Sequence, residues 1–334
     1  MHQPATLGAD AVRALLHLED TPVRRMAEGG EHATWFIGQD RVLRLATDED
    51  VTLRQRREVA LRDALRGRLP VPVPESLASG EWAPGLSYTL DRRLPGRSAE
   101  ERQVSGAGEL DLSGMLAALR SYGHGHPGPG DPDGAGAGDG GGSGAGAGAG
   151  DGNRAGDGTA AAGGEFRAGT GPAALPREPV RDPAGLREEA LRAVGRATVD
   201  PALDPGLVPR RLAAPPPPAA PDTAVLLHND LKGEHLLIGD DGGITGVLDW
   251  TDAALGDPAE DIAGLAISIG APAAVRAAAL ASYGPEVCLR GLWLARCDTL
   301  VRLAERVRGS AGGSPLPLLR TQRRRAWQLT PLDL

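Results

Sequence analysis

A glycine-rich tract in the middle of the chain constrains its fold more than any other sequence feature. Between residues 124 and 176, 20 of 53 residues are glycine, and most of the others are alanine, aspartate and proline. Such a composition buries too little apolar surface to compensate for the entropy lost on ordering. We therefore expect a disordered insertion at 124–176, and a fold built from the residues on either side of it.

Size and charge exclude several classes of protein. A chain of 334 residues is long enough for two lobes with substantial cores. Its 36 basic and 44 acidic residues give a net charge of -8, so we expect no nucleic-acid partner. Its apolar runs are too short to cross a bilayer, and its first ten residues do not resemble a secretory signal. These features predict a soluble, cytoplasmic protein with no membrane partner, and leave the oligomeric state unassigned.

The two cysteines are compatible with a reducing compartment. Cys288 and Cys297 stand nine residues apart within one helical pattern, without a CxxC motif or a neighbouring histidine. Buried reduced thiols are therefore expected here, rather than a metal site or a disulfide.

Before the insertion, the pattern predicts a small sheet with one helix. Residues 33–37 and 41–46 are short runs of β-branched, aromatic and aliphatic residues around a Gly-Gln-Asp turn, which is typical of a hairpin. Leucines and valines at helical spacing predict a helix over 48–68, and residues 86–90 read as a further strand.

After the insertion, helical patterns dominate. We expect helices over 186–198, 259–268, 273–283 and 286–308. Among them lie one apolar run, 224–227, and a predicted hairpin formed by 235–238 and 244–248 around a glycine-rich turn.

The densest group of chemically versatile residues lies at the two ends of this hairpin. Residues 228–235 read HNDLKGEH, and Asp249 follows the second strand. Asp230 and Asp249 are thereby brought towards a common point, as phosphoryl transfer requires: one carboxylate orients the attacking hydroxyl, and another holds magnesium. Either aspartate alone is as well explained by a turn, and only the joint pattern favours chemistry.

The combination HNDLKGEHLLI, GVLDW and GDPAEDIA resembles the catalytic core of the aminoglycoside phosphotransferase and small-molecule kinase family. The resemblance extends from about residue 27 to about residue 305. It implies an α+β, bilobal, protein-kinase-like fold with a small N-lobe sheet plus helix and a larger, mainly helical C-lobe. The implied divisions are a nucleotide-binding lobe at 1–90, a hinge and first C-lobe helix at 91–123, the insertion at 124–176, and a catalytic and acceptor-binding lobe at 177–334.

By resemblance, Asp230 is the catalytic base and Asp249 a metal ligand. His235 stands where the family usually has asparagine as the second metal ligand, and imidazole is a poorer ligand for magnesium than oxygen. Lys232, the only lysine of the chain, falls where protein kinases place a lysine near the transferred phosphate, although a solvated loop lysine explains it equally well. His228 is expected to brace the catalytic loop.

Two further aspartates, Asp257 and Asp261, are expected to cap the following helix and to hold the catalytic loop, rather than to contact substrate.

The N-lobe carries a weaker form of the same resemblance. Gly29 and Gly30 precede the first hairpin and are candidates to fold over the nucleotide phosphates. Arg44 stands in the place of the family's phosphate-binding lysine, with Glu58 as its implied partner; the alternative is a surface salt bridge. The nucleotide base is expected near residues 89–93.

The sequence therefore favours a magnesium-dependent kinase that uses ATP or GTP to phosphorylate a hydroxyl of a small molecule. Four acidic residues of the helical region would suit a cationic acceptor, unless they are solvated helix faces: Glu260, Glu286, Asp298 and Glu305. Two alternatives stay open at this point. One is a catalytically inactive, nucleotide-binding regulatory protein, and the other is a scaffold without nucleotide that uses the glycine- and proline-rich tracts.

Overall fold

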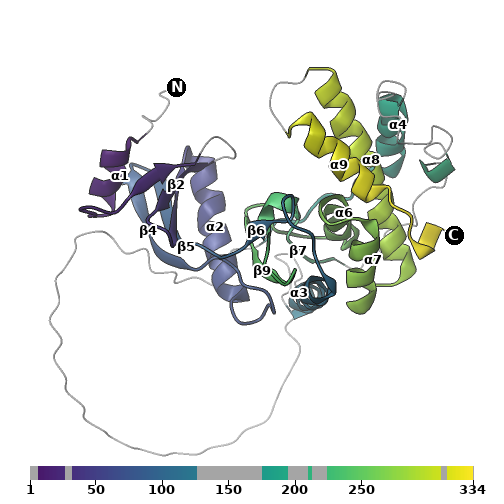
Figure 1. The fold of residues 1–334 in the computed structure, drawn as a ribbon, viewed down its shortest axis with the longest axis horizontal. Coiled ribbons are helices and arrows are strands. Elements are labelled where there is room, and N and C mark those ends of the chain that lie inside the picture. Colours follow the sequence, from purple (N-terminus) through teal and green to yellow (C-terminus); the bar gives the residue numbers. More distant parts are fainter. Residues whose placement is uncertain are drawn as a thin grey trace, which may run out of the picture.

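The computed structural model describes residues 7–26, 32–125, 175–194, 210–212, 224–309 and 314–333. An N-terminal lobe built on a sheet lies beside a C-terminal lobe made mainly of helices (Figure 1). The expected α+β architecture, with a smaller sheet-containing lobe and a larger helical lobe, is thus confirmed.

The N-terminal sheet has five antiparallel strands in the order β1-β2-β3-β5-β4. The predicted hairpin and the predicted strand at 86–90 are both present within it. Among the described residues of this lobe, two helices accompany the sheet. The elements of this lobe are α1 Ala9–Leu15, β1 Val23–Arg25, β2 His32–Ile37, β3 Arg41–Ala46, α2 Glu49–Leu65, β4 Ser76–Ala83 and β5 Leu86–Arg92.

Side chains of the central strands alternate between two environments, as the two-residue period of a strand requires. Leu43 and Leu45 of β3 pack with Leu90 of β5 in a small apolar core that also includes α1. Arg44, between the two leucines, faces α2 on the opposite side of the sheet, and so does Asp91, the neighbour of Leu90. The sheet thereby presents polar side chains to α2.

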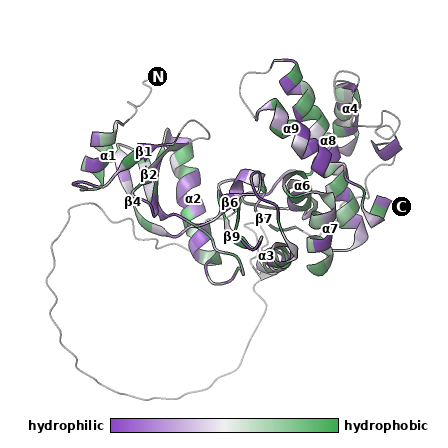
Figure 2. Cartoon of the chain, in the orientation of Figure 1, coloured by the Kyte–Doolittle hydropathy of each residue, from purple (hydrophilic) through white to green (hydrophobic). Residues whose placement is uncertain are grey.

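Helix α2 begins and ends close to its predicted bounds. The Asp48 carboxylate accepts a hydrogen bond from the Val51 backbone N–H at 2.8 Å, which caps the first turn. Gln55 donates to the Arg44 carbonyl at 3.1 Å and so fixes the helix against β3. Figure 2 shows many hydrophilic residues along α2.

In its described residues, the C-terminal lobe contains two small sheets among the helices. One sheet has the order β6-β8-β9, and the other pairs β7 with β10. Its elements are β6 Arg97–Ser98, α3 Gly106–Gly125, α4 Pro183–Val194, β7 Val225–Leu227, η1 Gly233–His235, β8 Leu236–Ile238, β9 Ile244–Val247, β10 Ala254–Gly256, α6 Ala259–Ser268, α7 Ala271–Leu280, α8 Pro285–Val307, α9 Leu316–Ala326 and η2 Pro331–Asp333.

The helices of this lobe enclose α6, which is largely apolar and lies in the centre of the main core (Figure 2). Helix α8 approaches it closely at Gly291, where an added Cβ would stand only 2.7 Å from Ile262 Cγ2. Glycine is therefore required at this crossing. The close packing fixes the position of α6. This helix carries Asp261, which accepts hydrogen bonds from the loop that contains Asp230.

One predicted boundary bears on the site and is wrong. The pattern predicts a strand that starts at His235, but His235 ends the 3-10 turn η1, and β8 begins at Leu236. The His235 backbone N–H bonds to the Lys232 carbonyl at 3.0 Å, which keeps the residue in the turn. The predicted helices at 186–198 and 273–283 instead begin at Pro183 and Ala271.

Residues 126–174 lie outside the described part of the chain, so the predicted disorder of the insertion stays a prediction. Among the helices that are described, none is long and apolar enough to cross a membrane.

Candidate active site

The loop from His228 to Asp230 follows β7 and is hydrogen-bonded to α6. The Asp261 carboxylate accepts hydrogen bonds from the backbone N–H groups of His228 at 2.9 Å and Asn229 at 2.8 Å. Asn229 adopts a left-handed φ of 67°. Burial raises the pKa of Asp261 to about 6, although the two N–H donors act in the opposite direction. The predicted tie between Asp261 and this loop is confirmed.

His228 joins the loop to the segment that carries Asp249. Its Nε2 donates to the Leu248 carbonyl at 2.8 Å, and its Nδ1 accepts the Asp230 N–H at 3.2 Å. The ring lies 4.6 Å from the Trp250 ring, centroid to centroid. Burial lowers the pKa of His228 to about 4, which leaves it neutral near pH 7. The residue braces the loop, as the sequence predicted.

His235 lies between the two carboxylates that the sequence singled out. Its Nδ1 is 2.9 Å from the Asp230 backbone carbonyl, which can only accept, so Nδ1 carries a proton and donates it. Its Nε2 is 3.6 Å from Asp249 Oδ2, and its Nδ1 is 3.6 Å from Asp230 Oδ2. Nε2 is therefore the ring nitrogen on the side of Asp249.

Asp249 stands on strained backbone at the end of the hairpin. Its φ is 57°, a left-handed value that aspartate tolerates better than most residues. Burial raises the pKa of its carboxyl, but His235, the adjacent Thr251 hydroxyl and Arg44 together outweigh burial and lower the pKa to about 2. Asp249 is therefore a carboxylate at neutral pH.

Lys232 contacts Asp230 and does not extend into solvent alone. Its Nζ donates to Asp230 Oδ2 at 2.8 Å, while its side chain stays 44% exposed. Four of the predicted site residues, Asp230, Lys232, His235 and Asp249, are thus in one group. An ammonium at this distance holds one oxygen of Asp230 and leaves the other for a further partner.

Arg44 of β3 forms the predicted ion pair with Glu58 of α2. Arg44 Nη2 donates to Glu58 Oε2 at 2.7 Å, and Arg44 Nε lies 3.3 Å from Asp91 Oδ2. Burial opposes both charges. It is outweighed, since the pKa of Arg44 is raised by Glu58 and Asp91, and the pKa of Glu58 is lowered by Arg44 and Arg62. The pair is buried and not a surface salt bridge.

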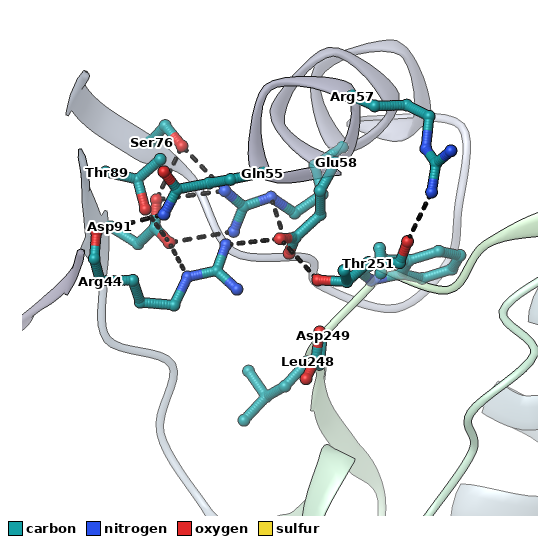
Figure 3. A network of polar contacts seen from close by, with 12 residues as sticks. Arg44, Gln55, Arg57, Glu58, Ser76, Thr89, Asp91, Leu248, Asp249 and Thr251 are labelled. Atoms are coloured by element: carbon teal, nitrogen blue, oxygen red, sulfur yellow. Dashed lines mark hydrogen bonds and ion pairs between the residues drawn. The ribbon is translucent and has the colours of Figure 1, made fainter. Parts of the chain in front are cut away.

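A second arginine-carboxylate pair beside it had not been predicted. Arg62 of α2 donates to both carboxylate oxygens of Asp91, at 3.1 and 3.2 Å, and to the Ser76 hydroxyl at 2.9 Å (Figure 3). The same Ser76 hydroxyl donates to Asp91 at 2.7 Å. Two arginines and two carboxylates therefore balance in charge under the sheet. Two patterns signalled this pair: Arg62 follows Glu58 by one helical turn, and strand alternation sends Asp91 inward.

The residues present fit a magnesium ion that is held mainly by substrate. Within the described ranges there is no group of three or more histidine, cysteine, aspartate or glutamate side chains that could hold a metal. Magnesium usually takes one or two protein ligands and completes its shell with phosphate and water. Asp249 would supply the carboxylate, and the Nδ1–H bond of His235 fixes the ring so that Nε2 would be a second donor, as is usual for a metal-binding histidine.

A family model, described as the phosphotransferase enzyme family, matches residues 22–294 of this chain. The match covers more than three quarters of its 334 residues. The chain belongs to this family. The resemblance stated from the C-lobe motifs is therefore correct, and the family is one of phosphotransferases.

Solved structures of similar fold come from the same group of enzymes. The GDP complex of wild-type aminoglycoside 2'-phosphotransferase-IIIa is 17% identical, with a TM-score of 0.59 over 95% of this chain and 96% of that one. The apoenzyme of macrolide 2'-phosphotransferase MphH from Brachybacterium faecium is 21% identical, with a TM-score of 0.53 over 97% and 99%. At these identities the likeness shows the fold alone, which is that of kinase-like phosphotransferases.

A curated relative matches only a short part of the chain. The uncharacterized protein YcbJ of Bacillus subtilis (strain 168) is 49% identical over 41 residues, which cover 12% of this chain and 13% of that protein. This match shows local similarity and carries no function.

The structure places the other residues singled out in the sequence in different environments. Gly29 and Gly30 lie outside the described residues. Glu286 and Glu305 are exposed on α8 and belong to a solvated helix face. Asp257 accepts from the Ala259 N–H at 3.0 Å at the start of α6, as predicted, and also pairs with Arg290.

The two other acidic residues of the helical region share one arginine. Arg181 contacts Asp298 at 2.6 and 3.0 Å and Glu260 at 3.4 Å. Burial, with further acidic groups nearby, raises the pKa of Glu260 to about 7 against the pull of Arg181. Close by, Glu178 accepts a hydrogen bond from the Asn229 side chain at 3.0 Å. This acidic group therefore adjoins the residue that precedes Asp230.

Proposed function

We propose that this protein transfers the terminal phosphoryl group of ATP or GTP to a hydroxyl of a small molecule, with magnesium. The observation that carries the proposal is the juxtaposition of two carboxylates across His235: Asp230 and Asp249 each have an oxygen 3.6 Å from one of its ring nitrogens. Phosphoryl transfer requires this pair of functions at adjacent positions, one for the hydroxyl and one for the metal.

Asp230 is assigned as the base that orients the acceptor hydroxyl and accepts its proton. Its backbone is fixed by His228 and, through Asn229, by Asp261, so the carboxylate is positioned before substrate binds. Lys232, bound to one of its oxygens, is assigned to the transferred phosphoryl group, where an ammonium compensates developing negative charge. The acceptor hydroxyl would then bond to the other oxygen.

Asp249 and His235 are assigned to the metal. When bound, magnesium would reduce the negative charge of the nucleotide phosphates. The part of this chain is to provide one carboxylate and one imidazole nitrogen on backbone held by His228 and by the η1 turn.

Arg44, oriented by Glu58, is assigned to the nucleotide phosphates, and so are Gly29 and Gly30 on the resemblance of the sequence to the family. Support comes from the burial of the Arg44–Glu58 pair and its place in a lobe of the family fold. A guanidinium can bind phosphate through two N–H groups at once, so it can replace the family's lysine with altered geometry.

The acceptor is proposed to be a small hydroxylated molecule. Similar structures include the kanamycin complex of one aminoglycoside phosphotransferase and the streptomycin-ATP complex of another. Glu260 and Asp298 suit a cationic acceptor, with Arg181 as the cation that they hold at present.

A second candidate is a nucleotide-binding protein of the same fold without turnover. It is favoured by one observation: the guanidinium of Arg44 already contacts two carboxylates, Glu58 at 2.7 Å and Asp91 at 3.3 Å. In that case nucleotide would bind, and no acceptor would be phosphorylated.

A panel of acceptors separates these candidates. The full chain is incubated with ATP or GTP, with and without magnesium, and with aminoglycosides, macrolides and simpler polyols, and mass spectrometry detects the gain of a phosphoryl group. Acceptor-dependent release of nucleoside diphosphate together with a phosphorylated product supports the kinase. Magnesium-dependent nucleotide binding without product from any acceptor favours the regulatory protein, and absence of nucleotide binding contradicts both.

A further inference from the structure

Helix α2 contacts the segment that follows Asp249 at two points. Arg57 donates to the Thr251 carbonyl at 3.0 Å, and the Thr251 hydroxyl donates to Glu58 Oε2 at 3.1 Å. These residues are more than 190 positions apart in sequence, and the contacts join the N-terminal lobe to the C-terminal lobe. Figure 3 shows both bonds, with Asp249 next to Thr251 below the helix.

Thr251 and Arg44 donate hydrogen bonds to the same oxygen of Glu58, Oε2. Arg44 Nη2 lies 2.7 Å from Glu58 Oε2, and the Thr251 hydroxyl reaches the same oxygen. Glu58 is 1% exposed and Thr251 is 5% exposed, so water does not readily replace either donor. One buried carboxylate oxygen therefore connects the arginine assigned to the nucleotide with the segment that carries the carboxylate assigned to the metal.

The contact fixes backbone that would otherwise relax. Asp249 has a φ of 57°, a conformation that persists in a non-glycine residue only where its surroundings hold it. On the preceding side, Leu248 is held by His228 and by the His235 carbonyl, which accepts the Leu248 N–H at 2.8 Å. On the following side, the hold comes from α2 through Thr251.

We propose that Thr251 is a positioning residue that couples nucleotide binding at Arg44 to metal binding at Asp249 through Glu58. The inference rests on the proposed function and goes beyond it, since Thr251 contacts neither substrate nor metal in this assignment. A ligand that draws Arg44 and Glu58 into place also sets Asp249, and by linkage the metal strengthens nucleotide binding by the same factor.

Titration of a fluorescent nucleotide, mant-ADP, tests the coupling. Its affinity for the full chain is measured in EDTA and in magnesium, and the ratio of the two gives the coupling factor. A hydrogen bond to a charged, buried group is worth enough for Thr251→Val to lower the affinity in magnesium by about tenfold. The affinity in EDTA should change less than about twofold, and Thr251→Ser, which keeps the hydroxyl, should restore the coupling.

Thr299→Val is the matched control. Thr299 is a buried threonine of α8 whose hydroxyl donates to the Ala295 carbonyl at 2.8 Å. Its loss should lower thermal stability and leave the coupling factor unchanged. Should Thr251→Val fail to fold, Arg57→Gln removes the other contact, to the Thr251 carbonyl, and is expected to reduce the coupling several-fold.

The outcomes are distinguishable. The inference is overturned if the wild type shows coupling and the coupling factor is just as large in Thr251→Val. If Thr251→Val does not fold, the same result in Arg57→Gln overturns it. Either result leaves the proposed function standing. A wild-type chain that binds no mant-ADP in magnesium overturns the proposed function and this inference together.

Discussion

The buried pair of Arg62 and Asp91 gives a quantitative test of the polar network under the N-lobe sheet. Arg62 is 1% exposed and Asp91 6% by side chain, and their two hydrogen bonds are 3.1 and 3.2 Å long. Arg62→Met removes one cation and leaves Arg44 to face both Glu58 and Asp91. Breaking such a buried pair costs about 3–5 kcal/mol, because an uncompensated charge stays in the interior.

The double variant should cost much less than the sum of its parts. Asp91→Leu alone leaves two arginines against Glu58, and we expect a loss of about 4 kcal/mol, as for Arg62→Met. With both changes, Arg44 and Glu58 stay as a balanced pair. The expected loss is then about 5 kcal/mol, so the coupling energy between the two sites is about 3 kcal/mol.

Equilibrium urea unfolding, followed by circular dichroism, measures these free energies. The control cycle uses Arg66 and Asp63 on the same helix, a pair at 2.7 Å whose side chains are 43% and 45% exposed. Its coupling should be below about 1 kcal/mol, as for other exposed pairs. Additive losses for Arg62 and Asp91 would refute the charge-balanced network.

Two further predictions concern Asp249 and Glu260. Asp249→Asn should abolish the magnesium dependence of mant-ADP binding while the thermal transition persists, because a charged oxygen ligand is replaced by a neutral one; an unchanged magnesium titration contradicts the assignment. For Glu260, burial raises the pKa from 4.5 to about 7, so the folded state binds more protons than the unfolded state. The folded protein therefore loses stability as pH rises from 4.5 to about 7. Glu260→Gln should therefore be more stable than wild type at pH 8, by an amount on the order of 2 kcal/mol, and gain nothing below about pH 4.5; a gain that does not vary with pH contradicts the shift.

Local sequence patterns were sufficient to predict which residues of the catalytic loop lie together. Asp230, His235 and Asp249 lie within one hairpin and its flanks, where short-range periodicity sets which residues meet. The secondary structure of His235 was predicted wrongly, as strand instead of turn. The turn depends on a hydrogen bond from its backbone N–H to the Lys232 carbonyl and on one from its side chain to the Asp230 carbonyl. Such bonds do not alter hydrophobic periodicity.

Contacts between distant elements were beyond local patterns. Thr251 and Arg57 meet only because the two lobes pack together, and nothing in the residues around Thr251 marks it. Helix α1 and strands β1 and β4 also lacked a clear signal. Strand β4, SLASGEWA, contains a glycine and no β-branched residue, and its place is set by pairing with β5.

Asp230 is assigned to the acceptor hydroxyl, and a comparison of rates tests this role. With an acceptor found in the panel, Asp230→Asn should lower kcat by roughly a hundredfold or more, as for loss of a general base, while mant-ADP affinity in magnesium changes little. Asp63→Asn, an exposed aspartate of α2, is the control and should leave both unchanged. A kcat within a few-fold of wild type in Asp230→Asn would contradict the assignment of Asp230 as the base.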